Sequence, residues 1–316
     1  MTEEAHLPET GSIEVVPRAE AAEIVEEVAH RQAEGSGAPR HPLLVVLDLD
    51  GTVLLEDESL SPGVVAAVRH ARDAGNEVMV ATGRSWGSTR GILRVLGLTP
   101  RYVVCSNGAV VMKLVDAEDL LYERAHTETF DPSVVLGLLR EHLPDAKYMV
   151  ELPDGERLFT EELHDWNLLQ ARRVPFEELG RQTVSRVVVV APGKSDEDFA
   201  RIIEEVGLSH VSYAIGWSAW LDIAPFGVDK GTALELVRGW LDVDPENVLV
   251  IGDGRNDLGM FRWALERGGR AVAMAQGPQE VLDAAGEVTA SVEEGGVAAV
   301  LRSLGAHEHG PRDVLE

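Results

Sequence analysis

The chain has 316 residues, of which 28 are basic and 54 acidic, so its formal net charge is −26. This length favours two modules over one small domain. Hydrophobic residues make up 45% of the chain, which supplies a large core and excludes wholesale disorder. The acidity argues against nucleic acid and anionic membranes as partners, because phosphate backbones attract Lys and Arg. It leaves a small anionic substrate open, since local donors and a metal ion can bind a phosphate ester.

Cys105 is the only cysteine, so the chain has no intrachain disulfide and no cysteine-built zinc site. Its position at the end of an apolar run predicts a core residue. No apolar run approaches the length that spans a bilayer. The N-terminus is acidic and lacks the basic and apolar regions of a secretory signal. We therefore expect a soluble cytoplasmic protein that does not act on a membrane.

Residues 1–40 differ from the rest, with nine acidic and three basic residues and no aromatic side chain. A helix could form over 20–34, but the Gly-Ser-Gly-Ala-Pro stretch at 35–39 is typical of a flexible linker. We expect a solvated, disordered extension. An arm that binds a partner is the alternative.

Buried strands and amphipathic helices alternate from residue 43 onward. Residues 43–47 are a continuous apolar run, typical of a strand covered on both faces. Ser61 is expected to cap a helix whose first residue is Pro62 and which ends near Gly75. Further strands are expected at 77–81 and 102–105, with a helix at 87–96 between them. This alternation of strands and helices predicts a parallel sheet with right-handed crossovers.

Residues 126–222 follow a different, mixed α+β pattern. Expected here are helices at 132–143 and 196–206, a hairpin of 148–152 with 157–159, a strand at 184–190, and paired strands at 211–215 and 219–223. After residue 222 the alternation of strands and helices returns, with helices expected at 230–241 and 257–267 and strands at 248–251 and 270–275. The pattern predicts an α/β, Rossmann-like parallel-sheet core with an inserted α+β module. The predicted divisions are an extension at 1–40, a core at 41–125 plus 223–305, the inserted module at 126–222 and a tail at 306–316.

The first polar motif is Asp-Leu-Asp-Gly-Thr at 48–52, directly after the first buried strand. Strand ends at the crevice of an open parallel sheet are where such folds bind ligands. Asp48 and Asp50 can divide nucleophilic or metal-binding work from proton transfer. A turn that merely ends the strand is the alternative, but the complete apolar run before the motif favours function.

Two further motifs offer groups for a phosphate. Thr82 and Gly83 follow the next strand, where a hydroxyl and a backbone N–H suit a phosphate oxygen, although such residues also simply cap helices. Lys230 is one of only four lysines among the 28 basic residues. A chain that otherwise uses Arg has a compact ammonium here, suited to pairing with a carboxylate and a phosphate together. A solvated lysine at a helix start is the alternative.

The last motif is Gly-Asp-Gly-Arg-Asn-Asp at 252–257, again after an apolar strand. Asp253, Asn256 and Asp257 offer a cluster of hard oxygen atoms, which suits Mg²⁺. A polar turn is the alternative, and the spacing does not match an EF-hand calcium loop.

Taken in this order, the motifs resemble those of the haloacid dehalogenase (HAD) superfamily of aspartate-nucleophile phosphatases, over residues 43–305. They look like the Cof-type branch, which has a large α/β (type IIB) cap between its second and third motifs, where the divergent middle segment lies. The resemblance departs at 274–278, Met-Ala-Gln-Gly-Pro, where the family often has a Gly-Asn-Ala-like stretch. The segments that carry it are 47–52, 81–84, 106–109 (Ser-Asn-Gly-Ala), 230–234 (Lys-Gly-Thr-Ala-Leu) and 252–260.

The resemblance implies a role for each matching residue. Asp48 would be the nucleophile and a metal ligand, Asp50 the general acid/base and a ligand through its backbone carbonyl, and Asp253 the residue that completes the metal site. Lys230 would fix the phosphate and Asp48. Asp257 would support the metal site without binding the ion directly. The phosphoryl group would be bound by Thr82, Gly83, Arg84, Asn107 and Asn256. Mg²⁺ and the ammonium would offset the repulsion between an anionic nucleophile and an anionic transition state.

The sequence therefore predicts a Mg²⁺-dependent phosphatase, a phosphoric monoester hydrolase. Its substrate would be a small phosphorylated metabolite, such as a sugar phosphate or a phosphorylated cofactor, and the reaction would pass through an aspartyl phosphate. A phosphomutase of the same superfamily and a non-catalytic metabolite-binding regulator are the alternatives, and the complete set of charged residues disfavours the regulator. Trp217 and Trp220 either line a substrate pocket or pack the cap. Neither the physiological substrate nor the oligomeric state can be derived from the sequence.

Overall fold

The computed structural model describes residues 42–162, 171–195, 198, 201–203, 205, 211–216 and 220–304. The predicted acidic extension at 1–40 and the predicted tail at 306–316 lie outside these residues. Among the helices of the described ranges, none is long and apolar enough to cross a membrane.

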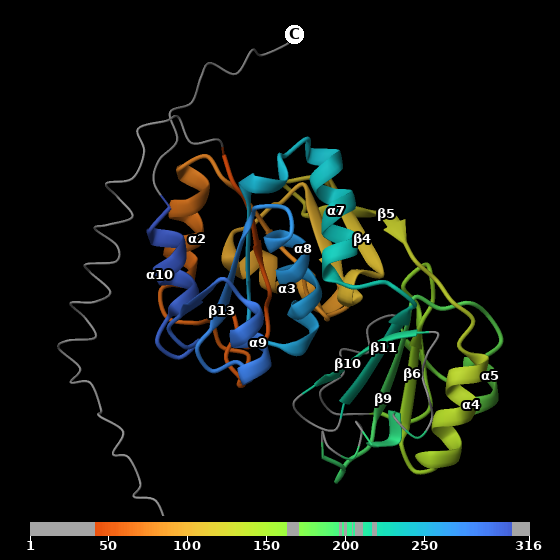
Figure 1. The fold of residues 1–316 in the computed structure, drawn as a ribbon. Helices are drawn as coiled ribbons and strands as arrows, with labels where there is room; N and C mark the ends of the chain where they lie inside the picture. Colours follow the sequence, from red (N-terminus) through yellow and green to blue (C-terminus); the bar gives the residue numbers. More distant parts are fainter. Residues whose placement is uncertain are drawn as a thin grey trace, which may run out of the picture. The chain divides into compact units, whose positions relative to one another are not determined.

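One sheet has five parallel strands in the order β14-β13-β12-β1-β2. Figure 1 labels one of these strands, β13 (Arg270–Met274), which lies among the helices of the core. Within it, β1 (Leu44–Leu47) pairs with β12 (Val248–Gly252) on one side and with the edge strand β2 (Glu77–Val80) on the other. The remaining strands are β13 (Arg270–Met274) and β14 (Glu287–Thr289). Every residue of β1 and β12 is buried, as the continuous apolar runs predict for strands covered on both faces.

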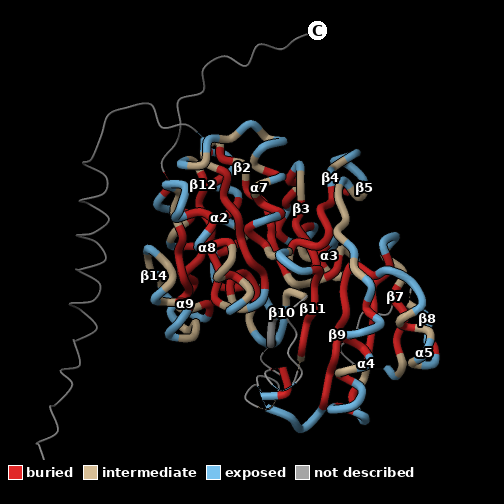
Figure 2. Tube along the Cα trace, turned by 45° about the vertical axis from the view of Figure 1, so that its right-hand side comes forward, coloured by how far each residue is buried: buried red, intermediate tan, exposed pale blue. Residues whose placement is uncertain are grey.

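Helices cover both faces of this sheet. Val45 and Leu47 belong to the apolar core formed with α2, α3 and α10, whereas Leu44 and Val46 belong to the core formed with α7, α8 and α9, because successive side chains of a strand point to opposite faces. Figure 2 shows the buried strands between partly exposed helices. The helices are α2 (Val64–Asp73), α3 (Trp86–Leu96), α7 (Lys230–Leu241), α8 (Leu258–Leu265), α9 (Gln279–Ala284) and α10 (Gly296–Arg302).

The start of α2 differs from the prediction that Ser61 caps a helix beginning at Pro62. The helix begins at Val64, and its N-cap is Gly63, whose φ of 75° lies in the left-handed region. The Ser61 hydroxyl is buried and donates to the carbonyl oxygen of Val292 at 2.7 Å. A partner distant in sequence has replaced the local capping bond, and no local pattern could have indicated it.

Three antiparallel strands extend the sheet system beyond β2. β3 (Tyr102–Cys105) pairs with β4 (Val110–Asp116), which pairs with β5 (Leu121–Thr127). A parallel bridge between Ala81 and Val104 connects β3 to the end of β2. The sequence analysis missed β4 and β5, because β5 mixes charged and apolar residues without a regular alternation. Cys105 is buried at the end of β3, as predicted.

A second, six-stranded sheet has the order β10-β11-β9-β6-β7-β8. Helices α4 (Ser133–His142) and α5 (Phe176–Leu179) cover one face of it and share its main apolar core. The predicted hairpin and the predicted pair of late strands are both confirmed, and the predicted helix at 196–206 lies partly outside the described residues. The strands are β6 (Lys147–Glu151), β7 (Arg157–Phe159), β8 (Ala171–Arg173), β9 (Arg186–Val190), β10 (Val211–Gly216) and β11 (Trp220–Pro225).

The predicted fold class, a Rossmann-like core with an inserted α+β cap, is confirmed. The domain boundaries stay predictions. β5 runs from 121 to 127 and β11 from 220 to 225, so one strand spans each predicted junction between core and cap.

Candidate active site

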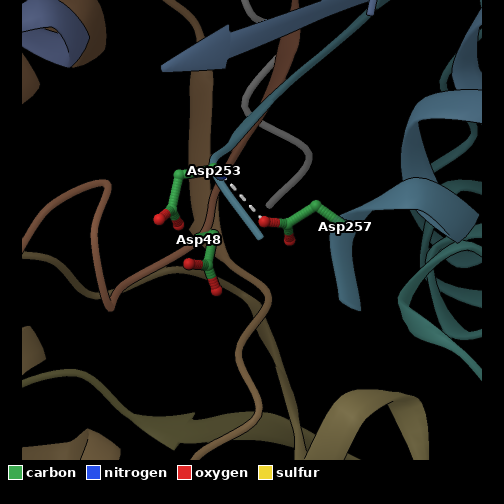
Figure 3. Close-up of side chains that lie close together, drawn as sticks. All are labelled: Asp48, Asp253 and Asp257. Atoms are coloured by element: carbon green, nitrogen blue, oxygen red, sulfur yellow. Dashed lines mark hydrogen bonds between the residues drawn. The ribbon is translucent and has the colours of Figure 1, made fainter. Parts of the chain in front are cut away.

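Three buried aspartates meet at one edge of the parallel sheet (Figure 3). Asp48 follows β1 and Asp253 follows β12, and these strands are neighbours in parallel register, so their carboxyl ends lie side by side. The Asp48 amide donates to the Ile251 carbonyl at 2.9 Å, which continues the pairing by one residue. One carboxylate oxygen each from Asp48, Asp253 and Asp257 lies within 4.8 Å of the other two. The topology of the sheet thus brings together residues that are two hundred positions apart.

The Asp253 carboxylate is incompletely satisfied. Its Oδ1 accepts from the Thr52 hydroxyl at 3.4 Å, but its buried Oδ2 has no hydrogen-bond partner among the described residues. A buried polar atom without a partner is costly. Burial, followed by the Asp257 charge, raises the pKa of Asp253 to about 7. An oxygen-only cluster with an unpartnered carboxylate oxygen fits a hard cation such as Mg²⁺.

Gly51 allows the first motif to approach Asp253 closely. Its φ is 76°, and a Cβ at this position would lie 2.1 Å from Asp253 Oδ2. Only glycine avoids this overlap. The glycine in the Asp-Leu-Asp-Gly-Thr motif therefore shapes the space beside the candidate metal ligand.

Lys230 links two of the three aspartates. Its Nζ lies 2.6 Å from Asp48 Oδ1 and 2.6 Å from Asp257 Oδ1, and its side chain is fully buried. Lys230 begins α7, where Asp229 and Thr232 form a capping box. A cation at a helix N-terminus is opposed by the helix dipole, so the two carboxylates must stabilise it. Burial lowers the pKa of Lys230, but Asp257 and Asp48 outweigh burial and the net direction is upward.

Asp257 uses both of its carboxylate oxygens within the protein. Oδ1 accepts from Lys230, and Oδ2 accepts from the backbone amides of Asp253 and Gly254, both at 2.9 Å (Figure 3). Asp257 therefore holds the turn after β12 and the ammonium at the same time. The supporting role expected for Asp257 at the metal site stays a prediction.

Burial dominates the electrostatics of Asp48. Its pKa lies well above the ordinary value because of burial, and Lys230 opposes this rise while the neighbouring aspartates add to it. A cation beside Asp48 would restore the ionised form that a nucleophile requires.

Asp50 lies apart from the three-carboxylate cluster. Its side chain is 51% exposed and binds Arg84 in two-pronged fashion, with Nε 2.9 and 3.0 Å from the two carboxylate oxygens. Arg84 also binds Glu58 at 2.8 Å. The expected metal ligand at this position is the Asp50 backbone carbonyl, and that role stays a prediction. Arg84, predicted to bind the phosphoryl group, here binds carboxylates.

The remaining predicted phosphate residues surround the same edge. Thr82 is fully buried, and its hydroxyl oxygen accepts from the Arg84 amide at 3.1 Å, so the hydroxyl keeps its proton for donation. Asn107 has a left-handed φ of 51°. Its Oδ1 accepts from Asn256 at 3.1 Å, and a Cβ at Gly83 would lie 3.1 Å from the same oxygen. Four residues from three motifs therefore lie close together, namely Thr82, Gly83, Asn107 and Asn256.

The sequence analysis missed three residues near the site. Gln276 lies in the segment that departs from the family pattern. Its Nε2 donates to the Gly51 carbonyl at 2.5 Å and its Oε1 accepts from the Val292 amide at 3.0 Å. Arg186 and Asp222 are buried charges in apolar strands, and that placement was the signal that could have indicated them.

The structure describes only one of the two tryptophans that were expected to line a substrate pocket or pack the cap. Trp220 packs against an apolar cluster of the six-stranded sheet that comprises Met149, Phe159, Val188 and Val190. This agrees with the cap-packing alternative. Trp217 lies outside the described residues.

Comparisons with known proteins address the family. The model for haloacid dehalogenase-like hydrolases matches residues 45–301. The chain is 28% identical over 273 residues to the 5-amino-6-(5-phospho-D-ribitylamino)uracil phosphatase YitU of Bacillus subtilis, covering 83% of this chain and 97% of that protein. It is 31% identical over 259 residues to the phosphoglycolate phosphatase of Haloarcula marismortui, covering 81% of this chain and 95% of that protein.

A solved structure has the same fold. It is described as a HAD subclass IIB sugar phosphatase and aligns with a TM-score of 0.67 at 18% identity, over 82% of this chain and 98% of that one. The family model spans most of the chain, and the similar curated proteins are phosphatases. The resemblance seen in the motifs is thereby confirmed. The chain belongs to the haloacid dehalogenase-like hydrolases, in their Cof-type branch, and is a phosphoric monoester hydrolase.

Proposed function

We propose that this protein is a Mg²⁺-dependent phosphatase of the cytoplasm that hydrolyses a small phosphorylated metabolite through an aspartyl phosphate on Asp48. One observation carries the proposal. A buried ammonium, Lys230, binds the candidate nucleophile Asp48 at 2.6 Å, beside the unpartnered oxygen of Asp253. Such a site holds an anionic nucleophile and a place for a cation together, which is what attack on a phosphate ester requires.

The side chains of Asp48 and Asp253 and the backbone carbonyl of Asp50 would hold Mg²⁺. When bound, the ion supplies positive charge to the phosphoryl oxygens and offsets their repulsion of the nucleophile. Lys230 supplies a second positive charge, at Oδ1 of the nucleophile. Asp257 keeps Lys230 in place through its own 2.6 Å contact.

Asp48 attacks phosphorus, and the bond from phosphorus to the ester oxygen breaks. Asp50 gives its proton to the departing oxygen, then takes a proton from the water that attacks the aspartyl phosphate. Inorganic phosphate leaves, and Asp48 is restored. Because Arg84 binds the Asp50 carboxylate in this structure, Asp50 must exchange this contact to reach the leaving oxygen.

The residues that would bind the phosphoryl group are Thr82, Gly83, Arg84, Asn107 and Asn256. The hydrogen bond from Asn256 to Asn107 supports this set. Relatives named for phosphatase action on a phosphoribitylaminouracil, on phosphoglycolate and on pyridoxal phosphate support a small phosphorylated substrate. Their named substrates share a phosphate ester and differ in the rest of the molecule, which supports a phosphoryl site that is separate from the part of the protein that selects the leaving group.

Rapid-quench measurements with an aryl phosphate test the proposal. Wild-type protein should release phosphate only with Mg²⁺. Asp48→Asn should form no phosphoenzyme. Asp50→Asn should give a burst of about one equivalent and then a slow steady state, since an aryl leaving group hardly needs the acid while the water step loses its base, worth about 10²–10⁴-fold. A burst from Asp48→Asn and none from Asp50→Asn would reverse the assigned roles, and full activity in excess chelator would exclude the metal.

A further inference from the structure

A row of buried charges crosses the six-stranded sheet. Arg157 on β7 lies opposite Glu151 on β6, which lies opposite Arg186 on β9. Arg186 in turn binds Asp222 on β11, with Nε and Nη2 each 2.6 Å from one carboxylate oxygen. The four residues are at most 7% exposed, and their charges alternate along the row. Apolar residues of similar volume would often stabilise a fold as well as such buried pairs, so the row needs a reason other than stability.

Two members of the row contact the loop between β3 and β4. Glu151 accepts from the Ser106 hydroxyl at 3.4 Å, and Asp222 accepts from Asn107 Nδ2 at 2.9 Å. On the other side of the same amide, Asn107 Oδ1 accepts from Asn256 at 3.1 Å. The Asn107 amide is therefore held between the six-stranded sheet and the turn that follows β12.

The chemistry of Asp222 decides the orientation of this amide. An ionised carboxylate only accepts hydrogen bonds, so it requires the NH₂ end of Asn107 to face it and the oxygen end to face Asn256. Arg186 fixes Asp222 in place, because its planar fork donates to both carboxylate oxygens. The NH₂ group of Asn107 retains a second N–H, which is the donor that the proposed function assigns to phosphate.

We propose that Asp222, fixed by Arg186, is a positioning residue for phosphoryl transfer: it orients the Asn107 amide, so the phosphoryl site is complete only while the six-stranded sheet contacts the core. This inference rests on the proposed function, in which Asn107 contacts the phosphoryl group. According to this inference, the cap contributes to phosphate binding through Asn107, and this contribution is separate from any contact between the cap and the leaving group.

Two double variants separate the acceptor at position 222 from the ion pair. Arg186→Met with Asp222→Leu replaces the pair by apolar side chains and removes the acceptor, an exchange that buried ion pairs often tolerate. Arg186→Met with Asp222→Asn also removes both charges but keeps an oxygen to which Asn107 can donate. Thermal unfolding establishes that each variant folds. The readouts are the inhibition constant of inorganic phosphate, which enters the site without a leaving group, and kcat and KM for an aryl phosphate.

We expect phosphate inhibition to weaken about tenfold in the leucine variant and less than about threefold in the asparagine variant, the difference being one hydrogen bond. In an Asn107→Ala background the difference should vanish, because the effect passes through Asn107. Equal phosphate constants in the two double variants, or a difference that persists without Asn107, overturns the inference.

A smaller change covers the case in which the apolar pair does not fold. Arg186→Lys loses the two-pronged hold on Asp222, so it should weaken phosphate inhibition, and this effect should also vanish with Asn107→Ala. Its persistence there overturns the inference. A wild-type protein that hydrolyses no phosphate ester contradicts the proposed function itself, whereas an active wild type with unchanged variants contradicts this inference alone.

Discussion

Lys230→Met tests the charge balance at the centre of the site. The ammonium lies 2.6 Å from one oxygen of Asp48 and of Asp257, and none of the three side chains is more than 4% exposed. Met is similar in length but uncharged, so the variant leaves two buried carboxylates without their cation. Removing one partner of a buried ion pair costs about 3–5 kcal/mol. We expect the metal-free variant to lose unfolding free energy of this order near neutral pH, together with its phosphatase activity.

The loss should depend on pH with a defined sign. Burial raises the pKa of Asp48, and Lys230 opposes this rise. A carboxyl group whose pKa is raised by folding contributes stability below its unfolded-state pKa, and this contribution is lost as the pH rises through the folded-state pKa. Without Lys230 the pKa of Asp48 rises further. As the pH falls, Asp48 in the variant therefore becomes protonated, which removes the free-energy cost of a buried, unpaired carboxylate. The deficit of Lys230→Met should be smaller in acid than above neutrality.

Urea unfolding in a chelating buffer, on both sides of neutrality, measures this deficit. Lys147→Met is the matched control, since Lys147 Nζ donates to the Glu162 carbonyl in an exposed position. Surface substitutions of this kind stay within about 0.5 kcal/mol. A Lys230→Met deficit no larger than that of the control, or one that grows as the pH falls, would refute the reasoning.

Two further outcomes concern the metal site. Burial and Asp257 raise the pKa of Asp253 to about 7 in the metal-free protein, so Mg²⁺ binding should release a proton in mild acid and little above pH 8. Calorimetry in two buffers of different ionisation enthalpy measures the number of protons released. Equal release at both pH values would count against this prediction. Gly51→Ala should weaken Mg²⁺ binding about 10–100-fold, as changes beside metal ligands do, because its Cβ would lie 2.1 Å from Asp253 Oδ2. Gly97→Ala shares the positive φ but meets no atom within 4 Å, so calorimetry should show unchanged Mg²⁺ binding, and equal loss in both variants would contradict the clash.

The residues of the charged centre could be predicted from the sequence because each motif is recognised within a few neighbouring residues. A continuous apolar run indicated a strand buried on both faces, and the polar residues directly after it had to lie at the sheet edge. The resemblance to the family joined Asp48 to Asp253, and the parallel pairing of β1 with β12 is what places them side by side. Lys230 needed one further signal, the scarcity of lysine in the chain.

The contacts of Ser61, Arg84 and Asn107 could not be derived in this way. Ser61 looked like a local cap, but its hydroxyl binds Val292, and Arg84 binds Asp50 and Glu58. Each side chain had several chemically suitable partners, and the choice among them depends on the register of strands and the course of loops. Hydrogen-bonding capacity is a property of the residue, whereas the partner is a property of the tertiary fold.

The charge of the site also constrains how a phosphate can enter it. If all three buried aspartates were ionised, the single ammonium would leave an excess of negative charge at the edge of β1 and β12, and the raised pKa values of Asp48 and Asp253 reflect this repulsion together with burial. A phosphate ester adds more, and the chain as a whole carries −26. In a buried, low-dielectric site such like charges repel strongly. The unpartnered oxygen of Asp253 offers the cation position that removes this excess, so the charge balance favours a cation at the site before a phosphate ester is bound.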